Sequence, residues 1–226
     1  MRRYFGALLA ITTVAVAAHG HALYLVPDAA DPGKAVVVFG HGLAPEKVRD
    51  GTWKKVAGLK LTALDGSGKA TELKFTEAKD HLAVAVPPGT RAVFGQVEYG
   101  VFAKEGAKPR LVKYYPKALL GAEPADRTAL TSPPLLEVLP VREGGKTRFR
   151  VVMMGKPVAG AAVEVLLPEK QEHADATTDD EGLTPGFEGV GRFGVTARVE
   201  VPKAGELNGQ KYEVIAYTAT LVVDVK

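Results

Sequence analysis

Two histidines stand one residue apart directly after an apolar segment at the start of the chain. They lie in the sequence Ala18-His19-Gly20-His21. If the chain is cut before His19, the new terminus offers an amine, two backbone amides that a metal ion can deprotonate, and the imidazole of His21. Nitrogen ligands of this kind suit square-planar copper(II) or nickel(II). The spacing therefore predicts a metal-binding N-terminus.

A third histidine is a candidate to complete the site. His41 follows an apolar, strand-like stretch, residues 35–39, and stands between Gly40 and Gly42, where the backbone can turn sharply and another segment can approach closely. If the first strand pairs beside it, His41 joins His19 and His21 in a three-imidazole site. Neutral imidazole is the ligand form, so we expect metal binding to weaken below about pH 6.

The apolar segment is organised like a secretory signal peptide. Arg2 and Arg3 carry the positive charge, and residues 5–17 form an apolar run too short to cross a bilayer comfortably. We therefore predict a cleaved signal peptide over residues 1–18 and export to the periplasm or the extracellular space. No later apolar run approaches the ~18 residues of a spanning helix, so we expect no transmembrane segment in the mature protein.

The position of the cut decides what the histidines can do. Cleavage after Ala18 makes His19 the first residue, whereas cleavage after Ala17 is the better match to a small-x-small site and makes His19 the second. Cleavage after Ala22 would remove both leading histidines. The sequence leaves these alternatives open.

Composition excludes several classes of function. Loss of Arg2 and Arg3 with the signal would leave 27 basic and 26 acidic residues, a formal charge of +1, so we expect no nucleic-acid partner. The absence of cysteine removes disulfides and thiolate ligands. Ser67 and Ser132 lie in a glycine-flanked turn and a proline-rich stretch, and neither has the setting of a catalytic nucleophile. We therefore expect a protein that is not an enzyme.

Short alternating segments separated by turns must position the histidines. Leu82, Val84 and Val86 alternate with other residues, and Asp65-Gly66-Ser67-Gly68 is a turn between two such segments. Only residues 117–121 have helical character. A polar, proline-marked stretch, residues 123–134, cannot continue a central strand and predicts a linker.

The expected fold class is therefore all-β, with two immunoglobulin-like antiparallel β-sandwich domains in tandem. The first would cover residues 19–122, with the metal-binding rim, and the second residues 135–226.

The second half resembles carboxypeptidase-regulatory and transthyretin-like modules of the immunoglobulin fold. The resemblance rests on residues 155–161 (Gly-Lys-Pro-Val-Ala-Gly-Ala), on Thr177-Thr178-Asp179-Asp180-Glu181-Gly182, and on Gly191-Arg192-Phe193-Gly194-Val195. It implies a sandwich that acts as a scaffold or a binding surface.

The mature chain as a whole resembles a periplasmic family of unknown function whose members are often described as accessory proteins of nickel or cobalt uptake. The matching passages are residues 19–27, residues 39–42 and residues 113–120. The resemblance implies a nickel or cobalt ion as the bound metal and a metal-uptake membrane transporter as a partner. Residues 19–26 are also similar to periplasmic copper-resistance proteins, which ligate copper through an N-terminal histidine.

The leading hypothesis is an exported, non-enzymatic protein that binds nickel or cobalt through His19, His21 and His41 and presents it to an uptake system. Two alternatives stay open. One is a copper-handling periplasmic protein, and the other is an interaction or polymer-binding module that uses the basic aromatic stretch 110–117. Three further candidates have plain structural explanations: His81 and His173 as solvated loop residues, and Trp53 as an exposed residue of a loop.

Overall fold

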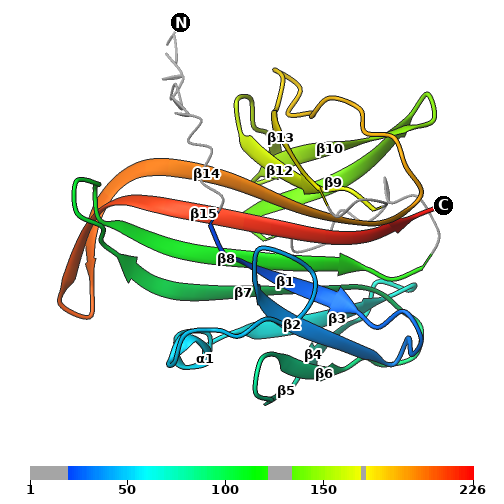
Figure 1. Ribbon diagram of the computed structural model, residues 1–226, viewed down its shortest axis with the longest axis horizontal. Coiled ribbons are helices and arrows are strands. Elements are labelled where there is room, and N and C mark those ends of the chain that lie inside the picture. Colours follow the sequence, from blue (N-terminus) through cyan, green and yellow to red (C-terminus); the bar gives the residue numbers. More distant parts are fainter. Residues whose placement is uncertain (1–19, 122–133, 169–171) are drawn as a thin grey trace, which may run out of the picture.

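The computed structural model describes residues 20–121, 134–168 and 172–226 (Figure 1). Strands account for 60% of the described residues and helix for 2%. The prediction of an all-β sandwich fold built from antiparallel sheets is therefore confirmed. The predicted signal peptide, His19, and all of the predicted linker except Pro134 lie outside the described residues.

The first sheet contains four antiparallel strands from the first half of the chain. Their order is β1 (Ala22–Pro27), β2 (Lys34–Gly40), β6 (Leu82–Ala85) and β5 (Phe75–Glu77). Although β1 is an edge strand, all six of its residues are buried. The reason is that β1 lies across β8 and β15 of a second, larger sheet (Figure 1).

The large sheet contains eight strands and draws them from both halves of the chain. The order is β13, β12, β14, β15, β8, β7, β3 and β4. β8 and β15 run parallel, and all other neighbours are antiparallel. The strands are β3 (Lys60–Asp65), β4 (Ala70–Leu73), β7 (Thr90–Phe102), β8 (Arg110–Leu119), β12 (Ala162–Leu166), β13 (His173–Thr177), β14 (Gly191–Leu207) and β15 (Gln210–Val225).

The longest hairpin of the large sheet closes through a two-residue turn. Leu207 pairs with Gln210, which leaves Asn208 and Gly209 as the turn residues, with φ of 50° and 79°. Positive φ at both positions is the geometry that asparagine followed by glycine favours, and its twist matches that of the flanking strands. The turn thus aligns β14 with β15 over almost their full length.

The third sheet belongs to the second half of the chain. Its order is β11 (Lys156–Pro157), β10 (Lys146–Met153) and β9 (Leu136–Glu143), all antiparallel. β9 also contacts β15 of the large sheet.

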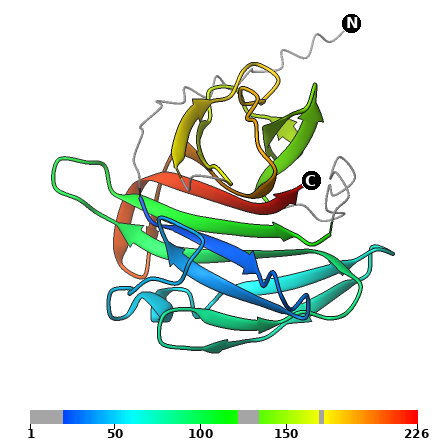
Figure 2. The same ribbon diagram turned by 45° about the vertical axis from the view of Figure 1, so that its right-hand side comes forward.

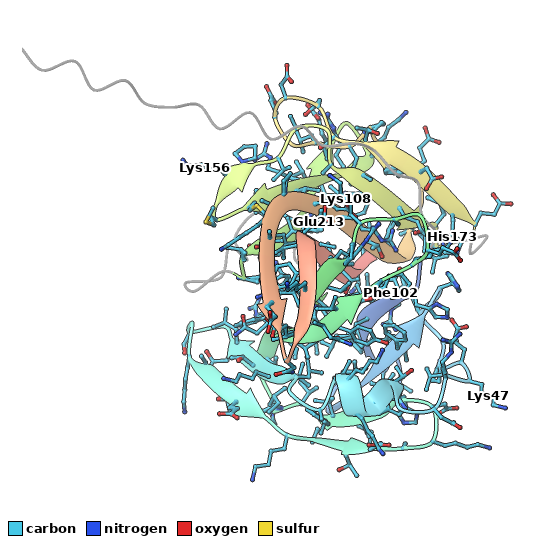
Figure 3. All side chains as sticks on the ribbon, turned by 90° about the vertical axis from the view of Figure 1, so that its left-hand side faces the viewer. Lys47, Phe102, Lys108, Lys156, His173 and Glu213 are labelled. Carbon is cyan, nitrogen blue, oxygen red and sulfur yellow. The ribbon has the colours of Figure 1, made fainter. Side chains whose placement is uncertain are left out.

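The two small sheets cover opposite faces of the large sheet. Tyr114 and Tyr115 are consecutive in β8, yet Tyr114 belongs to the core under the first sheet and Tyr115 to the core under the third. Because consecutive strand residues point to opposite faces, the molecule has three layers where β8 and β15 lie (Figure 2). In Figure 3, Lys156 of the third sheet and Lys47 near the first sheet lie at opposite ends of the molecule.

The sharing of one sheet was not foreseen in the expectation of two sandwiches in tandem. β8 comes from the first half and β15 from the second, and they pair over nine positions, from Val214 with Arg110 to Val222 with Ala118. Each half therefore completes its sandwich with a sheet that continues into the other half.

A buried ion pair also connects the halves. The ammonium of Lys117 on β8 donates to the carboxylate of Glu137 on β9, and the two side chains are 2% and 3% exposed. Burial lowers the pKa of Lys117, while the neighbouring carboxylate acts in the opposite direction. The helix predicted over residues 117–121 is therefore wrong, since β8 continues to Leu119 and places this lysine inside the protein.

The prediction that Trp53 is exposed is also wrong. Trp53 lies in the short helix α1 (Thr52–Lys55), and its side chain is 7% exposed in the first core. The apolar residues Val56 and Leu59 that follow are buried as well. The composition of this stretch is typical of a loop and does not indicate that the indole is buried at one end of the sandwich.

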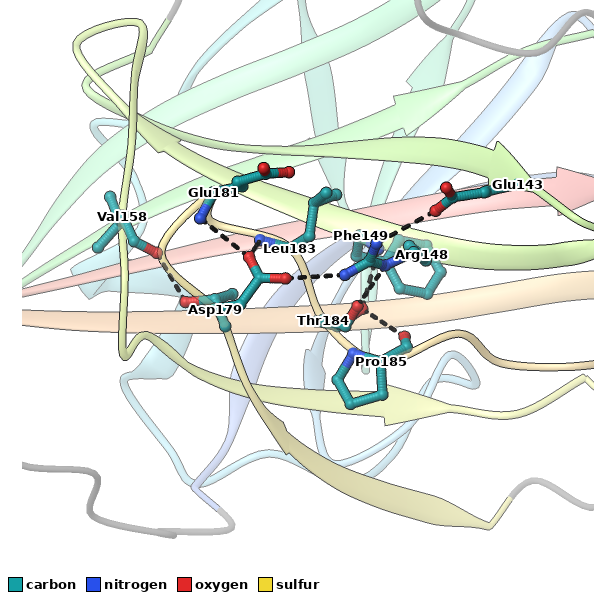
Figure 4. Close-up of polar contacts among 10 residues, drawn as sticks. Glu143, Arg148, Phe149, Val158, Asp179, Glu181, Leu183, Thr184 and Pro185 are labelled. Carbon is teal, nitrogen blue, oxygen red and sulfur yellow. Dashed lines mark hydrogen bonds and ion pairs between the residues drawn. The ribbon is translucent and has the colours of Figure 1, made fainter.

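The Thr177–Gly182 passage ends in a tight turn, in which the amide of Gly182 donates to the carbonyl of Asp179 at 2.9 Å. Asp179 Oδ1 accepts hydrogen bonds from the amides of Glu181 and Leu183, at 3.0 and 2.9 Å (Figure 4). Its other oxygen, Oδ2, accepts from Arg148 of β10 at 2.8 Å. The hydrogen bond from the Leu183 amide is the main cause that lowers the pKa of Asp179.

We expect the contribution of this turn to the stability of the protein to decrease in acid. Since the folded pKa of Asp179 lies below its ordinary value of 3.8, its contribution is present at higher pH and disappears as pH falls below that value and through the folded pKa. The urea midpoint of the protein should therefore fall more between pH 5 and pH 3 than that of Asp179→Asn, which keeps the acceptor oxygen but carries no charge. Equal losses in both proteins would contradict this assignment.

Candidate metal-binding site

His21 and His41 lie opposite each other at one end of the first sheet. The pairing of β1 with β2 ends at Ala22 and Gly40, so His21 and His41 occupy the next position of the same register. Their ring centroids are 4.3 Å apart, with the ring planes tilted by 45°. Both side chains are exposed. The structure thus brings together two of the three histidines singled out in the sequence, and the third, His19, lies outside the described residues.

The histidine pair continues into a cluster of aromatic rings. His21 stacks on Phe39 with ring centroids 5.4 Å apart, and Phe39 stacks on Tyr99 at the same separation. Tyr114 meets both Phe39 and Tyr99 edge to face. Burial raises the pKa of Tyr114, so its hydroxyl stays protonated at ordinary pH. These contacts fix the side of the His21 ring that faces the protein.

Side chains of the large sheet hold the backbone on either side of His21. Arg198 donates to the carbonyl of Gly20 at 2.7 Å, and Tyr114 donates to the carbonyl of His21 at 3.3 Å. Thr220 donates to the carbonyl of Leu23 at 2.7 Å. These donors take the place of a neighbouring strand along the free edge of β1. They set the position of the chain at the point where the histidine motif begins.

His41 is positioned by Glu46. The amide of His41 donates to Glu46 Oε1 at 2.7 Å. A Cβ at Gly40 would lie 1.9 Å from the same oxygen, so the absence of a side chain there lets the carboxylate approach. A Cβ at Gly42 would meet nothing within 4 Å, so glycine is not required there for space. The close approach foreseen beside His41 is made by this carboxylate, which holds the backbone of the candidate ligand.

The spacing of the two rings is compatible with shared metal coordination. A metal–nitrogen bond of about 2.0–2.1 Å places an imidazole centre roughly 3 Å from the ion, so two imidazoles at a right angle have centres about 4–5 Å apart. The observed 4.3 Å is in this range. A right angle belongs to square-planar or octahedral coordination rather than to tetrahedral zinc. Within the described residues, however, no group of three or more histidines, cysteines or carboxylates is arranged to hold an ion.

The other two described histidines are paired with carboxylates. His81 Nδ1 lies 2.8 Å from Asp80 Oδ1, and His173 Nδ1 lies 2.5 Å from Glu164 Oε1. Glu164 also binds Arg198 at 3.2 Å. Neither His81 nor His173 meets the His21 and His41 rings, so neither belongs to the candidate site. The prediction of a loop at His173 is wrong, because His173 begins β13 and pairs with Leu166 of β12.

A pocket opens beside the histidine pair, and it was not predicted from the sequence. Its volume is about 440 Å³, and His21 and Phe39 form one wall. Val112 and Tyr114 of β8 lie in its floor with Ala216 of β15. Further lining comes from α1, β7 and β14, so residues from most of the chain contribute. Two features singled out in the sequence, His21 and the aromatic stretch 110–117, contribute to its lining.

That stretch does not form the basic surface proposed for an interaction module. β8 is a central strand, so the side chains of residues 110–117 alternate between the two faces of the sheet. Arg110 pairs with Glu200 at 2.5 Å, Lys113 pairs with Glu98 at 2.9 Å, and Lys117 is buried. The positive charges are therefore neutralised or enclosed, which disfavours this stretch as a docking surface for an anionic polymer.

Comparison with known proteins adds little to this picture. No family model matches the sequence, and no curated protein matches it. A tetra-tandem repeat from the extending region of a large adhesion protein is 11% identical, with 91% of this chain and 50% of that chain covered and a TM-score of 0.23. A pullulanase from Anoxybacillus solved with maltotetraose is 14% identical, with 86% and 26% covered and a TM-score of 0.20.

This chain thus spans half the length of the first structure and 26% of the second. At such TM-scores neither likeness bears on the function. In the part of the chain that the structure describes, no helix combines the length and apolarity needed to cross a membrane.

Proposed function

We propose that this protein is exported and binds a divalent transition metal, nickel or cobalt, which it presents to a membrane uptake system. The role is one of binding and delivery and not of catalysis. The observation that supports it best is the cross-strand pair of exposed imidazoles, His21 and His41, with ring centroids 4.3 Å apart. The separation is compatible with two nitrogen ligands of one ion, and nitrogen ligands suit nickel(II).

The remaining ligands would come from the processed N-terminus. Two imidazoles leave half of the coordination positions of a square-planar ion open, and more than half of those of an octahedral ion. His19 lies two residues before His21, and removal of residues 1–18 would add a terminal amine at His19 itself. Because Arg198 holds the carbonyl of Gly20, these groups would start from an anchored point beside the His21 ring.

Exposure of the pair fits delivery better than permanent storage. Neither His21 nor His41 is enclosed, so a second protein can approach an ion held there and exchange ligands with it. Copper(II) binds nitrogen sites more tightly than nickel or cobalt do, and selectivity in a cell depends on which metal is supplied. Handling of copper is therefore the closest variant of this proposal.

Nuclear magnetic resonance of the imidazole protons tests the proposal residue by residue. We expect nickel sulfate, added in steps to one equivalent to the signal-cleaved protein, to shift or broaden the signals of His21 and His41 together and before those of His81 and His173. Magnesium sulfate, the matched control, should change none of them because magnesium prefers oxygen ligands. The proposal is wrong if the imidazole of His81 or His173 responds first, or if no histidine responds by one equivalent.

A further inference from the structure

The pocket beside the histidines has the size and lining of a small-molecule site. Its volume of about 440 Å³ falls in the range of ligand pockets, which is about 300–1,000 Å³. Phe39, Tyr99 and Phe102 present aromatic rings to it. Phe102 (labelled in Figure 3) is 51% exposed and is therefore free to contact a ligand. A ligand in the pocket would cover it.

The pocket is open where the first sheet stops short of the end of the large sheet. β7, β8, β14 and β15 extend beyond β1 and β2, and they supply the floor. The segment that contains α1 closes the opposite side. A flat body could therefore lie over the exposed ring of Phe102 and meet the edges of Phe39 and Tyr99, since edge-to-face contacts between aromatic rings are favourable.

The charged side chains that line the pocket are four cations, Arg49, Lys55, Arg110 and Arg198, and two carboxylates, Asp50 and Glu200. Two of its four cations are neutralised, since Arg110 pairs with Glu200 and Arg198 pairs with Glu164. The other two, Arg49 and Lys55, form no ion pair with any carboxylate in the described part of the chain. Lys55 Nζ lies 5.0 Å from the centre of the Tyr99 ring.

Tyr99 lies within the electrostatic influence of Arg49. Its pKa is raised, with burial the largest cause, while hydrogen bonding to Thr52 and the charge of Arg49 both act to lower it. Arg49 is thus close enough to stabilise negative charge at the inner wall of the pocket. A carboxylate entering beside Tyr99 would meet both unpaired cations.

We propose that the pocket binds a small organic anion with a flat aromatic body, whose ring packs against Phe39 and Tyr99 and whose carboxylate faces Arg49 and Lys55. The inference is independent of the proposed metal. His21 lines the pocket but His41 does not, so loss of the metal through His41 leaves the anion site intact.

Two probes of the same shape test the inference on metal-free protein. 2-Naphthoate carries the carboxylate, and 2-naphthamide is its neutral counterpart. Saturation-transfer NMR and the indole N–H signal of Trp53, the single tryptophan, can both report binding, because Thr52 and Lys55 of the same helix line the pocket. We expect 2-naphthoate to bind at least tenfold more tightly than 2-naphthamide.

Variants locate the binding and separate its two parts. Arg49→Ala combined with Lys55→Ala should reduce the affinity for 2-naphthoate at least tenfold, to the affinity measured for 2-naphthamide. The matched control, Lys47→Ala with Lys54→Ala, removes equal charge from the same segment outside the pocket and should change affinity less than twofold. Ala216→Phe places a large side chain in the floor of the pocket and should reduce the affinity for both probes. The melting temperature of this variant shows whether it folds.

Several results would overturn the inference. They are equal affinity for the two probes, equal loss in the two charge variants, or no binding at all. Since Arg49 and Lys55 are surface side chains, the charge variants stay informative even if Ala216→Phe fails to fold. The metal-binding proposal is judged separately, because His41→Ala should lose metal and still bind 2-naphthoate.

Discussion

Replacing His21 and His41 together by alanine is expected to weaken nickel binding at least 100-fold, which corresponds to about 2.8 kcal/mol. The two rings face each other across β1 and β2 and can act as one chelating unit. Exposed side chains at the end of a sheet contribute little to stability, so the melting temperature should change by only a few degrees. Isothermal titration calorimetry on signal-cleaved protein measures the affinity.

The single variants make the prediction sharper. If both rings bind one ion, His21→Ala and His41→Ala should each cost nearly as much as the double variant, because removal of either ring destroys the chelate. His81→Ala is the matched control and should leave the affinity unchanged, since His81 pairs with Asp80 away from the site. Two small and additive losses would show that the histidines do not share a metal ion.

Lys117→Met is expected to reduce the free energy of unfolding by about 3–5 kcal/mol. Methionine fills a similar space but leaves the carboxylate of Glu137, which is 3% exposed, without its cation. The cost of an uncompensated buried charge is large because the protein interior solvates it poorly. Urea denaturation followed by Trp53 fluorescence and by circular dichroism gives the change.

A second substitution separates the charge effect from packing. Lys117→Met with Glu137→Leu removes both charges and should recover most of the lost stability. The two optical probes should report one coincident transition, because β8 and β15 connect the halves within one sheet. If Lys117→Met alone is as stable as the wild type, or if the double variant is no better than the single one, the ion pair does not contribute as described.

Local sequence patterns predicted much of the secondary structure. Alternation at Leu82 and Val84, and the turn at residues 65–68, correspond to β6 and to the β3–β4 hairpin. Near Asp179 the short polar side chain bonds its own backbone, which is a local property that sequence can reveal. Even the pairing of His21 with His41 could be anticipated, because it needs only two consecutive strands and a short turn.

Pairings between strands that are distant in the chain could not be predicted from the sequence. Nothing in residues 110–119 or 210–225 indicates that these strands lie side by side and parallel, since alternation reports which face a residue takes and not which strand is its neighbour. The helix expected at residues 117–121 failed for the same reason. Lysine, alanine and leucine have good helix propensity, and tertiary pairing overrode it.

The sequence alone therefore determined the all-β class, most of the strands and turns, and the histidines that meet across β1 and β2. Only the tertiary structure decided that one large sheet serves both halves, that Lys117 is buried against Glu137, and that an aromatic pocket opens beside His21. The physical reason is the distance along the chain over which each interaction acts. Backbone preference and side-chain alternation act over a few residues, whereas the pocket and the ion pair require strands brought together from distant parts of the chain.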